Sequence, residues 1–144
     1  MDTSPNIEAW NNFVLLSQPS DYQVGTIERA AAIANLYVGL ANNGGINSFL
    51  TCTNRLDATE VLESLVSIGA LEAAKQFNMV LRGLKTSVPA SSPEARFILL
   101  ERHWTNLLDE LDILSEEANA DLRRALELHV TMHEAFYQEL KTPG

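Results

Sequence analysis

The residues best able to do chemistry form a run of carboxylates in the last third of the chain. Between residues 107 and 121 there are six acids and no lysine or arginine, namely Asp109, Glu110, Asp112, Glu116, Glu117 and Asp121. Carboxylates can bind a divalent cation, transfer a proton, or pair with the arginines and lysines of another molecule. The run lacks the alternating ligand spacing and central glycine of an EF-hand loop, which argues against calcium. A catalytic carboxylate pair stays open, although nothing in the sequence indicates a cleft.

His129 and His133 form the second candidate group. They lie four residues apart on one face of an expected helix, which is a suitable spacing for two metal ligands. The pattern His-Glu-x-x-His is absent and no third ligand is indicated nearby, so we predict no metal site. Two histidines hydrogen-bonded inside the core are the favoured interpretation, and an interface or ligand-binding role stays open.

The single cysteine and the hydroxyl side chains form no recognisable catalytic arrangement. Cys52 lies in an apolar stretch with no histidine or other base beside it, which favours a buried small side chain. The serines and threonines show no nucleophile-elbow pattern. We therefore expect a protein that is not an enzyme and that needs no cofactor.

The segment Asn43-Gly44-Gly45 could belong to a phosphate-binding loop or to a corner between helices. A phosphate loop usually places its glycines between a strand and a helix, with a lysine at a defined spacing. Here a helical pattern precedes the glycines, and no lysine follows until Lys75. We interpret the segment as a structural turn. Asn43 or Gly44 would end one helix in the left-handed conformation, and Gly45 would lead into the next.

An all-α domain of six to seven helices, covering residues 1–144, is expected to position these groups. Apolar residues recur with helical spacing almost throughout, and no convincing alternating pattern of a strand is present. The expected loop covers residues 86–93, and the expected helix caps are Ser4, Asp57 with Glu60, Ser92 and Asn119. The expected helices run from about Pro5 through Val14 and over about residues 26–41, 46–51, 57–68, 70–84, 93–117 and 120–141.

The overall charge and composition restrict the classes of function. The chain has a net charge of −9, with 46% hydrophobic and 20% charged residues. This balance argues against direct binding of nucleic acid or of an anionic membrane, both of which need excess lysine and arginine. No apolar run is long enough to cross a bilayer, and the first residues lack the basic start of a signal peptide. A single cysteine suits a reducing compartment, so we expect a cytoplasmic protein.

If residues 93–117 form one helix, the acids lie on a different face from the leucines. Asp109, Asp112 and Glu116 then fall within about 60° of each other around the helix axis. The five carboxylates from residue 109 to residue 117 follow each other about every 3 Å along that axis. The phosphates of one DNA strand are about 3.4 Å apart along the axis, so the local charge density is comparable. A solvated outer face is the ordinary alternative, because charged residues commonly cover exposed helices.

Three segments together resemble a known family. They are Asn43-Gly44-Gly45, the stretch VLESLVSIGALEAAKQF at residues 61–77, and the acidic LLDELDILSEE followed by HVTMHEAF near the end. In this order, over about residues 25–137, they are similar to a largely uncharacterised bacterial family of DNA-mimic-protein-like domains. The resemblance implies an acidic, all-helical, dimeric protein that occupies the DNA-binding surface of a transcriptional regulator. Ile46 and Leu50 depart from it, because the family usually has aromatic residues after the glycines.

The leading hypothesis is a non-enzymatic domain that binds another protein, namely a basic DNA-binding regulator, through its carboxylates. The predicted partner-binding residues are Asp109, Asp112, Glu116 and Glu117, with Glu60 and Glu63 as extensions. Two alternatives stay open. One is an enzyme or small-ligand module with a pocket near His129 and His133. The other is a purely structural domain that forms a homodimer through an apolar helix face.

Overall fold

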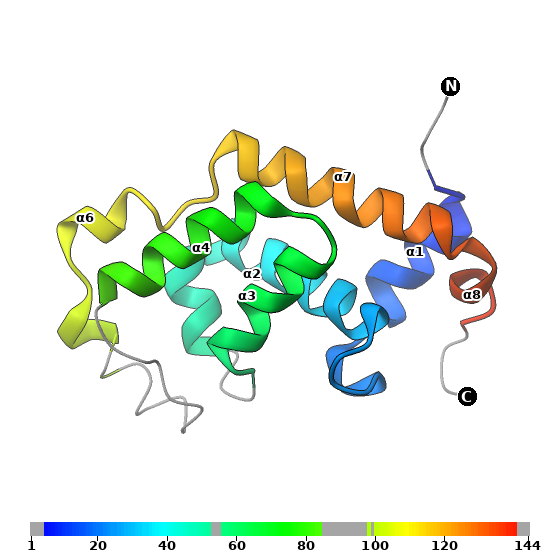
Figure 1. Ribbon diagram of the computed structural model, residues 1–144, viewed down its shortest axis with the longest axis horizontal. Coiled ribbons are helices and arrows are strands. Elements are labelled where there is room, and N and C mark those ends of the chain that lie inside the picture. Colours follow the sequence, from blue (N-terminus) through cyan, green and yellow to red (C-terminus); the bar gives the residue numbers. More distant parts are fainter. Residues whose placement is uncertain (1–4, 53–55, 85–97, 99, 141–144) are drawn as a thin grey trace.

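The computed structural model describes residues 5–52, 56–84, 98 and 100–140 (Figure 1). Seven α-helices and one 3₁₀ turn have bounds within these residues, residues 98 and 100–103 are helical as well, and no strand occurs among the described residues, which confirms the predicted all-α class. The expected loop at residues 86–93 and the expected caps Ser4 and Ser92 lie outside the described residues. The elements are α1 (Ile7–Leu16), η1 (Pro19–Asp21), α2 (Ile27–Cys52), α3 (Ala58–Ser67), α4 (Leu71–Leu84), α6 (Asn106–Asp109), α7 (Glu116–Met132) and α8 (Glu134–Gln138).

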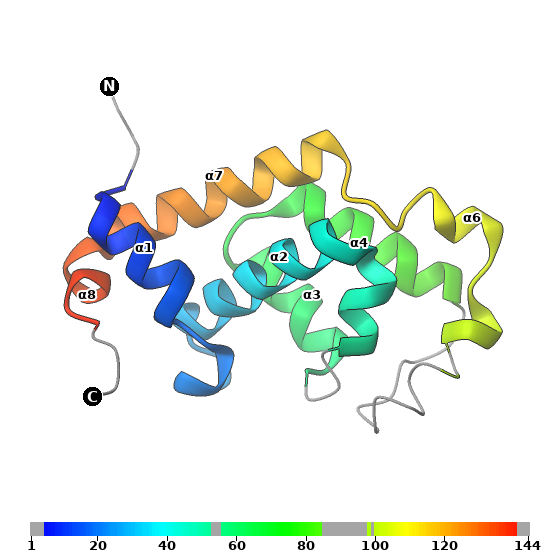
Figure 2. The same cartoon turned by 180° about the vertical axis from the view of Figure 1, so that it is seen from behind.

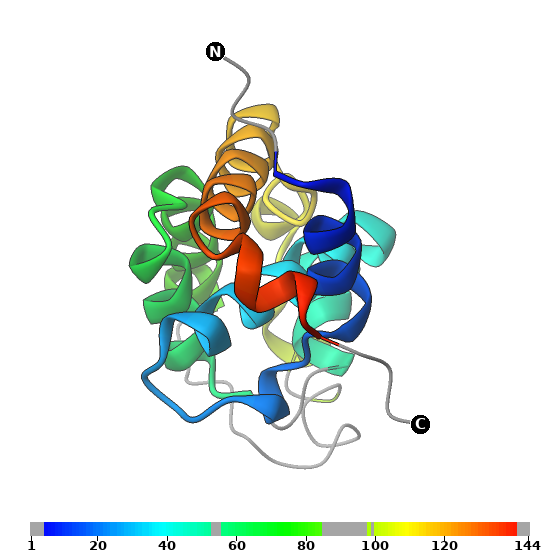
Figure 3. The same ribbon diagram turned by 90° about the vertical axis from the view of Figure 1, so that its right-hand side faces the viewer.

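Helix α2 lies at the centre of the arrangement. It contacts α3 on one side and α7 on another, and α3 continues into α4, which packs against α7. Figure 1 shows α3 and α4 in front of α2, whereas in Figure 2 α1 and α2 face the viewer and α7 runs along the upper edge. In the end-on view of Figure 3, α3 and α4 lie on one side of α7 and α1 lies on the other. None of the described helices is long and apolar enough to cross a membrane.

Three aromatic rings form the middle of the core. Tyr37 packs edge-on against Phe49 and Phe77, with ring centroids 4.9 Å and 5.4 Å apart. All three side chains are fully buried. Edge-to-face contacts of this kind add to the gain from burying apolar area. Because Tyr37 and Phe49 both belong to α2 and lie on either side of Gly45, their contact holds the two halves of this helix at a fixed angle.

A second aromatic group joins the two ends of the chain. The Phe13 ring of α1 packs against the Tyr137 ring of α8 at 5.1 Å and lies 6.2 Å from the His129 ring of α7. The side chain of Asn6 caps α1 by accepting a hydrogen bond from the Ala9 N–H at 3.1 Å. Both termini of the described fold are therefore tied to one cluster.

The predicted long helix over residues 93–117 is wrong in its second half. After residue 103 the chain leaves the helical conformation, forms the short α6, and passes through residues 110–115 without regular helix. Helix α7 begins at Glu116, and the Ser115 hydroxyl caps it by accepting a hydrogen bond from the Ala118 N–H at 3.1 Å. A serine followed by acids in the first turn is a strong helix start. Asn119, the predicted cap, lies inside α7 instead.

The predicted last helix over residues 120–141 also ends differently. Helix α7 stops at Met132, the chain turns at His133, and α8 follows as a separate short helix. In one straight helix, residues 129 and 137 would be about 12 Å apart along the axis. The turn instead brings the Tyr137 hydroxyl to 2.6 Å from Nε2 of His129. The break between α7 and α8 thus accompanies full burial of the Tyr137 side chain in the core.

Candidate functional site

The Asn-Gly-Gly segment forms a bend inside α2, and Asp112 binds to it. Gly45 has φ 89° and ψ 170°, a conformation that residues with a side chain rarely adopt, whereas the predicted left-handed residue was Asn43 or Gly44. The N–H of Ile46 donates to the main-chain oxygen of Asp112 at 2.7 Å, and the N–H of Asn47 donates to Oδ1 of Asp112 at 2.7 Å. Unpaired N–H groups and the positive end of the helix dipole favour a carboxylate at this place. Asp112 therefore caps the second half of α2.

Gln76 of α4 holds the connection between α6 and α7, residues 110–115, on the side opposite to α2. This α4 residue is only 8% exposed. Its Nε2 donates to the main-chain oxygens of Leu111 and Ile113 at 2.9 Å and 2.8 Å, and its Oε1 accepts from the Ser115 N–H at 3.0 Å. A buried carboxamide with three hydrogen bonds meets the usual requirement for a polar group in a core. Residues 111–115 are therefore held by α2 and by α4 together.

Asp121 and Asp57 also accept hydrogen bonds from N–H groups at the starts of helices. The Asp121 carboxylate of α7 accepts a hydrogen bond from the Glu72 N–H at 2.9 Å, at the beginning of α4, and from Arg124 at 2.6 Å. Burial opposes ionisation of Asp121, but these hydrogen bonds outweigh it and hold its pKa below the usual value. Asp57 caps α3 as predicted, because its Oδ1 accepts from the Thr59 N–H at 2.9 Å. Part of the negative charge therefore has an internal structural role.

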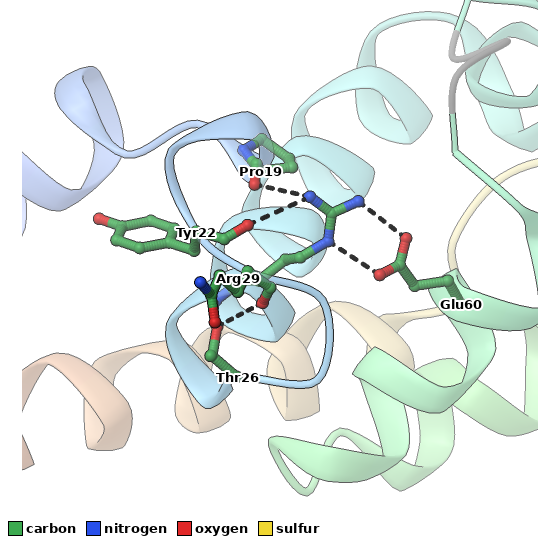
Figure 4. A network of polar contacts seen from close by, with 6 residues as sticks. Pro19, Tyr22, Thr26, Arg29 and Glu60 are labelled. Carbon is green, nitrogen blue, oxygen red and sulfur yellow. Dashed lines mark hydrogen bonds and ion pairs between the residues drawn. The ribbon is translucent and has the colours of Figure 1, made fainter.

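Glu60 binds an internal arginine (Figure 4). The guanidinium of Arg29 donates to both Glu60 carboxylate oxygens, at 2.8 Å and 2.9 Å, and to the carbonyl oxygen of Pro19 at 2.9 Å. The two side chains are only 15% and 19% exposed. This bidentate pair ties η1, α2 and α3 together, and it replaces the Asp-x-x-Glu box expected for Glu60. Glu63 is exposed and lines a cavity of about 260 Å³ next to this pair.

Four exposed carboxylates lie at the two ends of the connection, residues 110–115, that Asp112 and Gln76 hold. We call this set the acidic corner, and it consists of Asp109, Glu110, Glu116 and Glu117. The indole N–H of Trp104 donates to Oδ1 of Asp109 at 2.7 Å, a contact that leaves the carboxylate charge in place. Within the described residues no lysine or arginine forms an ion pair with any of the four. The single helical face predicted for Asp109, Asp112 and Glu116 is wrong, because these residues belong to the end of α6, the connection and the first turn of α7, respectively.

The two histidines have different surroundings. His129 is 6% exposed, and its Nε2 is hydrogen-bonded to the Tyr137 hydroxyl. Burial, together with the nearby His133, lowers the pKa of His129 to about 4. The His133 ring lies 4.7 Å from the His129 ring and is half-buried. In the part of the chain that the structure describes, no group of three or more potential metal ligands is found.

Sequence reasoning did not identify Gln76 or the capping role of Asp112. Gln76 lies on the buried face of α4 among Ala73, Phe77 and Val80. A polar residue inside an apolar stripe was the available signal that some group must be bound there. Asp112 offered no comparable signal, because its partners lie 65 positions away in the sequence.

Comparison with known proteins gives a family but no individual relative. A search of curated proteins found no match, and a search of solved structures found none either. The family model described as DMP19-like protein matches residues 24–137, which include the bend in α2, the connection and both histidines. The chain therefore belongs to the DMP19-like protein family.

Proposed function

We propose that this chain is a non-enzymatic protein-binding domain whose acidic corner occupies the DNA-binding surface of a basic regulator. The observation that carries the proposal is a set of four exposed carboxylates with no internal cation in the described residues. Membership of the DMP19-like family, which is not a known enzyme family, is consistent with such a role.

The mechanism is electrostatic competition with phosphates. Carboxylates form short, charge-assisted hydrogen bonds with arginine and lysine, the residues that hold a DNA backbone. The connection between α6 and α7 is already fixed by Gln76 and Asp112, so less conformational entropy is lost on binding than for a free loop. Ile113, which is 73% exposed in this connection, adds apolar area next to the charges. That combination suits a protein surface better than a simple cation.

Two of the predicted residues take different parts in this proposal. Asp112 positions the acidic corner rather than contacting the partner, because its carboxylate is engaged by the start of the second half of α2. Glu60 is excluded from the contact surface, since Arg29 neutralises it. Asp109, Glu116 and Glu117 remain as contact residues, and Glu110 joins them. Glu63 is a peripheral extension.

The test compares two double charge reversals with the same net charge. Glu116→Lys with Glu117→Lys changes the acidic corner, whereas Glu8→Lys with Glu139→Lys changes exposed acids of α1 and the C-terminal end. Each tagged variant is used to capture proteins from an extract of the native cells. A captured DNA-binding protein is then purified, and its release from operator DNA by the full chain is measured by gel shift.

We expect the acidic-corner variant to lose capture and DNA release, whereas the control variant keeps both. Raising the salt concentration should weaken the wild-type interaction, because exposed charges are screened. Equal behaviour of the two variants, or a salt-insensitive complex, would contradict the proposal.

A further inference from the structure

The cavity of about 260 Å³ beside the Arg29–Glu60 pair lies between the start of α2 and one face of α3. The α3 residues that line it are Glu60, Glu63, Ser64 and Ser67, which recur three and four positions apart and therefore share one side of the helix. Residues of the loop before α2 and of its first turn line the rest. Sites for drug-sized ligands usually measure about 300–1,000 Å³, so this cavity suits a smaller group.

The cavity contains a buried hydroxyl that has no partner. Ser64 is only 6% exposed, and within the described residues its Oγ takes part in no hydrogen bond. Helical serines and threonines often donate to the carbonyl oxygen four residues earlier, as Thr51 does to Asn47 at 2.8 Å. Among the described residues, the Tyr37 hydroxyl is the only unpaired side-chain polar atom that is completely enclosed, so Oγ of Ser64 reaches open space. That space is the cavity, which Ser64 lines.

The arginine in the cavity wall is already occupied. The Arg29 guanidinium donates to both carboxylate oxygens of Glu60. It also donates to the main-chain oxygens of Pro19 and Tyr22, as Figure 4 shows. A guanidinium has five N–H donors, so these contacts leave it little capacity for an anion. Both oxygens of Glu60 are engaged as well, and a calcium ion takes six to eight oxygen ligands, so a metal ion is not favoured either.

Glu63 gives the cavity an unbalanced negative charge. Arg29 neutralises Glu60, whereas within the described residues no lysine or arginine forms an ion pair with Glu63. Glu63 and Ser67 are both exposed, and one helical turn separates them. The free carboxylate of Glu63 and the hydroxyl oxygens of Ser64 and Ser67 therefore offer three acceptors to one cavity. A cation with several hydrogen-bond donors matches this arrangement.

We propose that this cavity binds a primary alkylammonium group, the end group of a small aliphatic amine or of a lysine side chain. An ammonium group carries three donors and no acceptor. It donates to the Glu63 carboxylate in a charge-assisted hydrogen bond and to the hydroxyl oxygens of Ser64 and Ser67. The attached methylene groups pack against Ile27 and Ala30, which line the opposite wall. The site shares no residue with the acidic corner, so either proposal can fail alone.

Pentylamine is the probe, and pentan-1-ol is its uncharged control of the same chain length. Each is titrated into the ¹⁵N-labelled full chain at physiological salt, and the backbone amide resonances are followed by NMR. We expect saturable shifts confined to α3 and the start of α2, with the amine at least about tenfold tighter than the alcohol. Equal affinities would overturn the proposal. So would amine shifts spread evenly over all exposed carboxylates, which indicate an adventitious ion only.

Substitutions in the cavity separate binding from stability. Glu63→Gln and Ser64→Ala should each weaken pentylamine binding about tenfold. Glu72→Gln removes the same charge from an exposed acid of α4 and should bind as wild type. Ser64→Ala should melt at the wild-type temperature or slightly above it, because no internal hydrogen bond is lost and alanine favours helix. If Glu63→Gln binds as wild type, or if Ser64→Ala binds as wild type and melts lower, the proposal is overturned.

A blocked lysine, Nα-acetyl-lysine N-methylamide, distinguishes the two sources of the ammonium group. Affinity equal to that of pentylamine assigns the cavity to a lysine of a polypeptide, and much weaker affinity assigns it to a free amine. In either case the tighter ligand must lose affinity when its terminal nitrogen is acetylated, and unchanged affinity would overturn the proposal. The Glu116→Lys, Glu117→Lys variant should bind pentylamine as wild type, which tells a failure of this site from a failure of the acidic corner.

Discussion

The two ends of the molecule bury polar groups in opposite ways. At the end formed by α6 and the start of α7, the buried polar side chain is Gln76, a neutral carboxamide with three hydrogen bonds. At the end formed by α1 and α8, the buried polar side chains include Ser17 and His129, and the His129 imidazole can take up a proton. A neutral amide is indifferent to pH, whereas a buried imidazole makes its surroundings sensitive to acid. One of the groups that hold the acidic surface, Gln76, is therefore independent of pH, whereas the aromatic cluster contains a buried imidazole.

The largest effect is expected at the bend that Asp112 caps. In Gly45→Ala, the new Cβ would collide with the Asp112 carboxylate and would force a residue with a side chain into a glycine conformation. We expect the free energy of unfolding in urea to fall by roughly 2–4 kcal/mol. Gly39→Ala, in a regular part of the same helix, should instead raise it by about 0.5–1 kcal/mol. Equal effects would show that the bend is not under this constraint.

The second-largest effect is expected at the α1–α8 end, where His129 makes the free energy of unfolding depend on pH. Since the pKa of His129 is about 4 when folded and about 6.5 when unfolded, the unfolded chain binds more protons between these values. The contribution of neutral His129 to the free energy of unfolding is fully present above pH 6.5. It is lost as the pH falls toward 4, by about 3 kcal/mol in total.

The measurement is urea unfolding across that pH range. His129→Gln keeps a hydrogen-bonding group near Tyr137 but cannot titrate, so its stability should depend on pH more weakly by that amount. His103→Gln is the control and should keep the wild-type dependence. If the free energy of unfolding of His129→Gln changed with pH as steeply as that of the wild type, the acid sensitivity would belong to other groups.

The smallest effect is expected when the hydrogen-bond acceptor of Asp112 is tested separately from its negative charge. Asp112→Ala should lower the free energy of unfolding by about 1–2 kcal/mol, because two elements lose their connecting hydrogen bond. Asp112→Asn keeps an acceptor for the Asn47 N–H and should cost about 0.5 kcal/mol or less. If Asp112→Asn were as damaging as Asp112→Ala, the negative charge rather than the cap would hold the connection.

Most of the fold could be predicted from the sequence, because helical periodicity and caps are local signals. Asp57 before α3 and the glycine between α3 and α4 illustrate this. The α6–α7 connection could not be predicted in the same way. Leucines 107, 108, 111 and 114 keep helical spacing through it, and neither glycine nor proline interrupts them. Tertiary hydrogen bonds that the Gln76 amide and the Ile46 N–H donate to main-chain oxygens of this connection stabilise a non-helical path there.

The candidate surface was predictable in composition but not in arrangement. A count of acids does not reveal which carboxylates meet a helix start or a guanidinium. Asp112 and Glu60 resemble Glu116 and Glu117 in the sequence, yet the fold engages the first two and exposes the others. That division depends on contacts between residues that are 31 and 65 positions apart.

The bond between Asn47 and Asp112 has a kinetic implication as well. It closes a stretch of 65 positions that includes α3 and α4. Bringing together such distant points is entropically costly until the intervening helices have docked. We therefore expect this contact to form late in folding and to protect its amide from hydrogen exchange only in the fully assembled molecule. A nascent or partly folded chain would carry the same carboxylates without the shape that presents them.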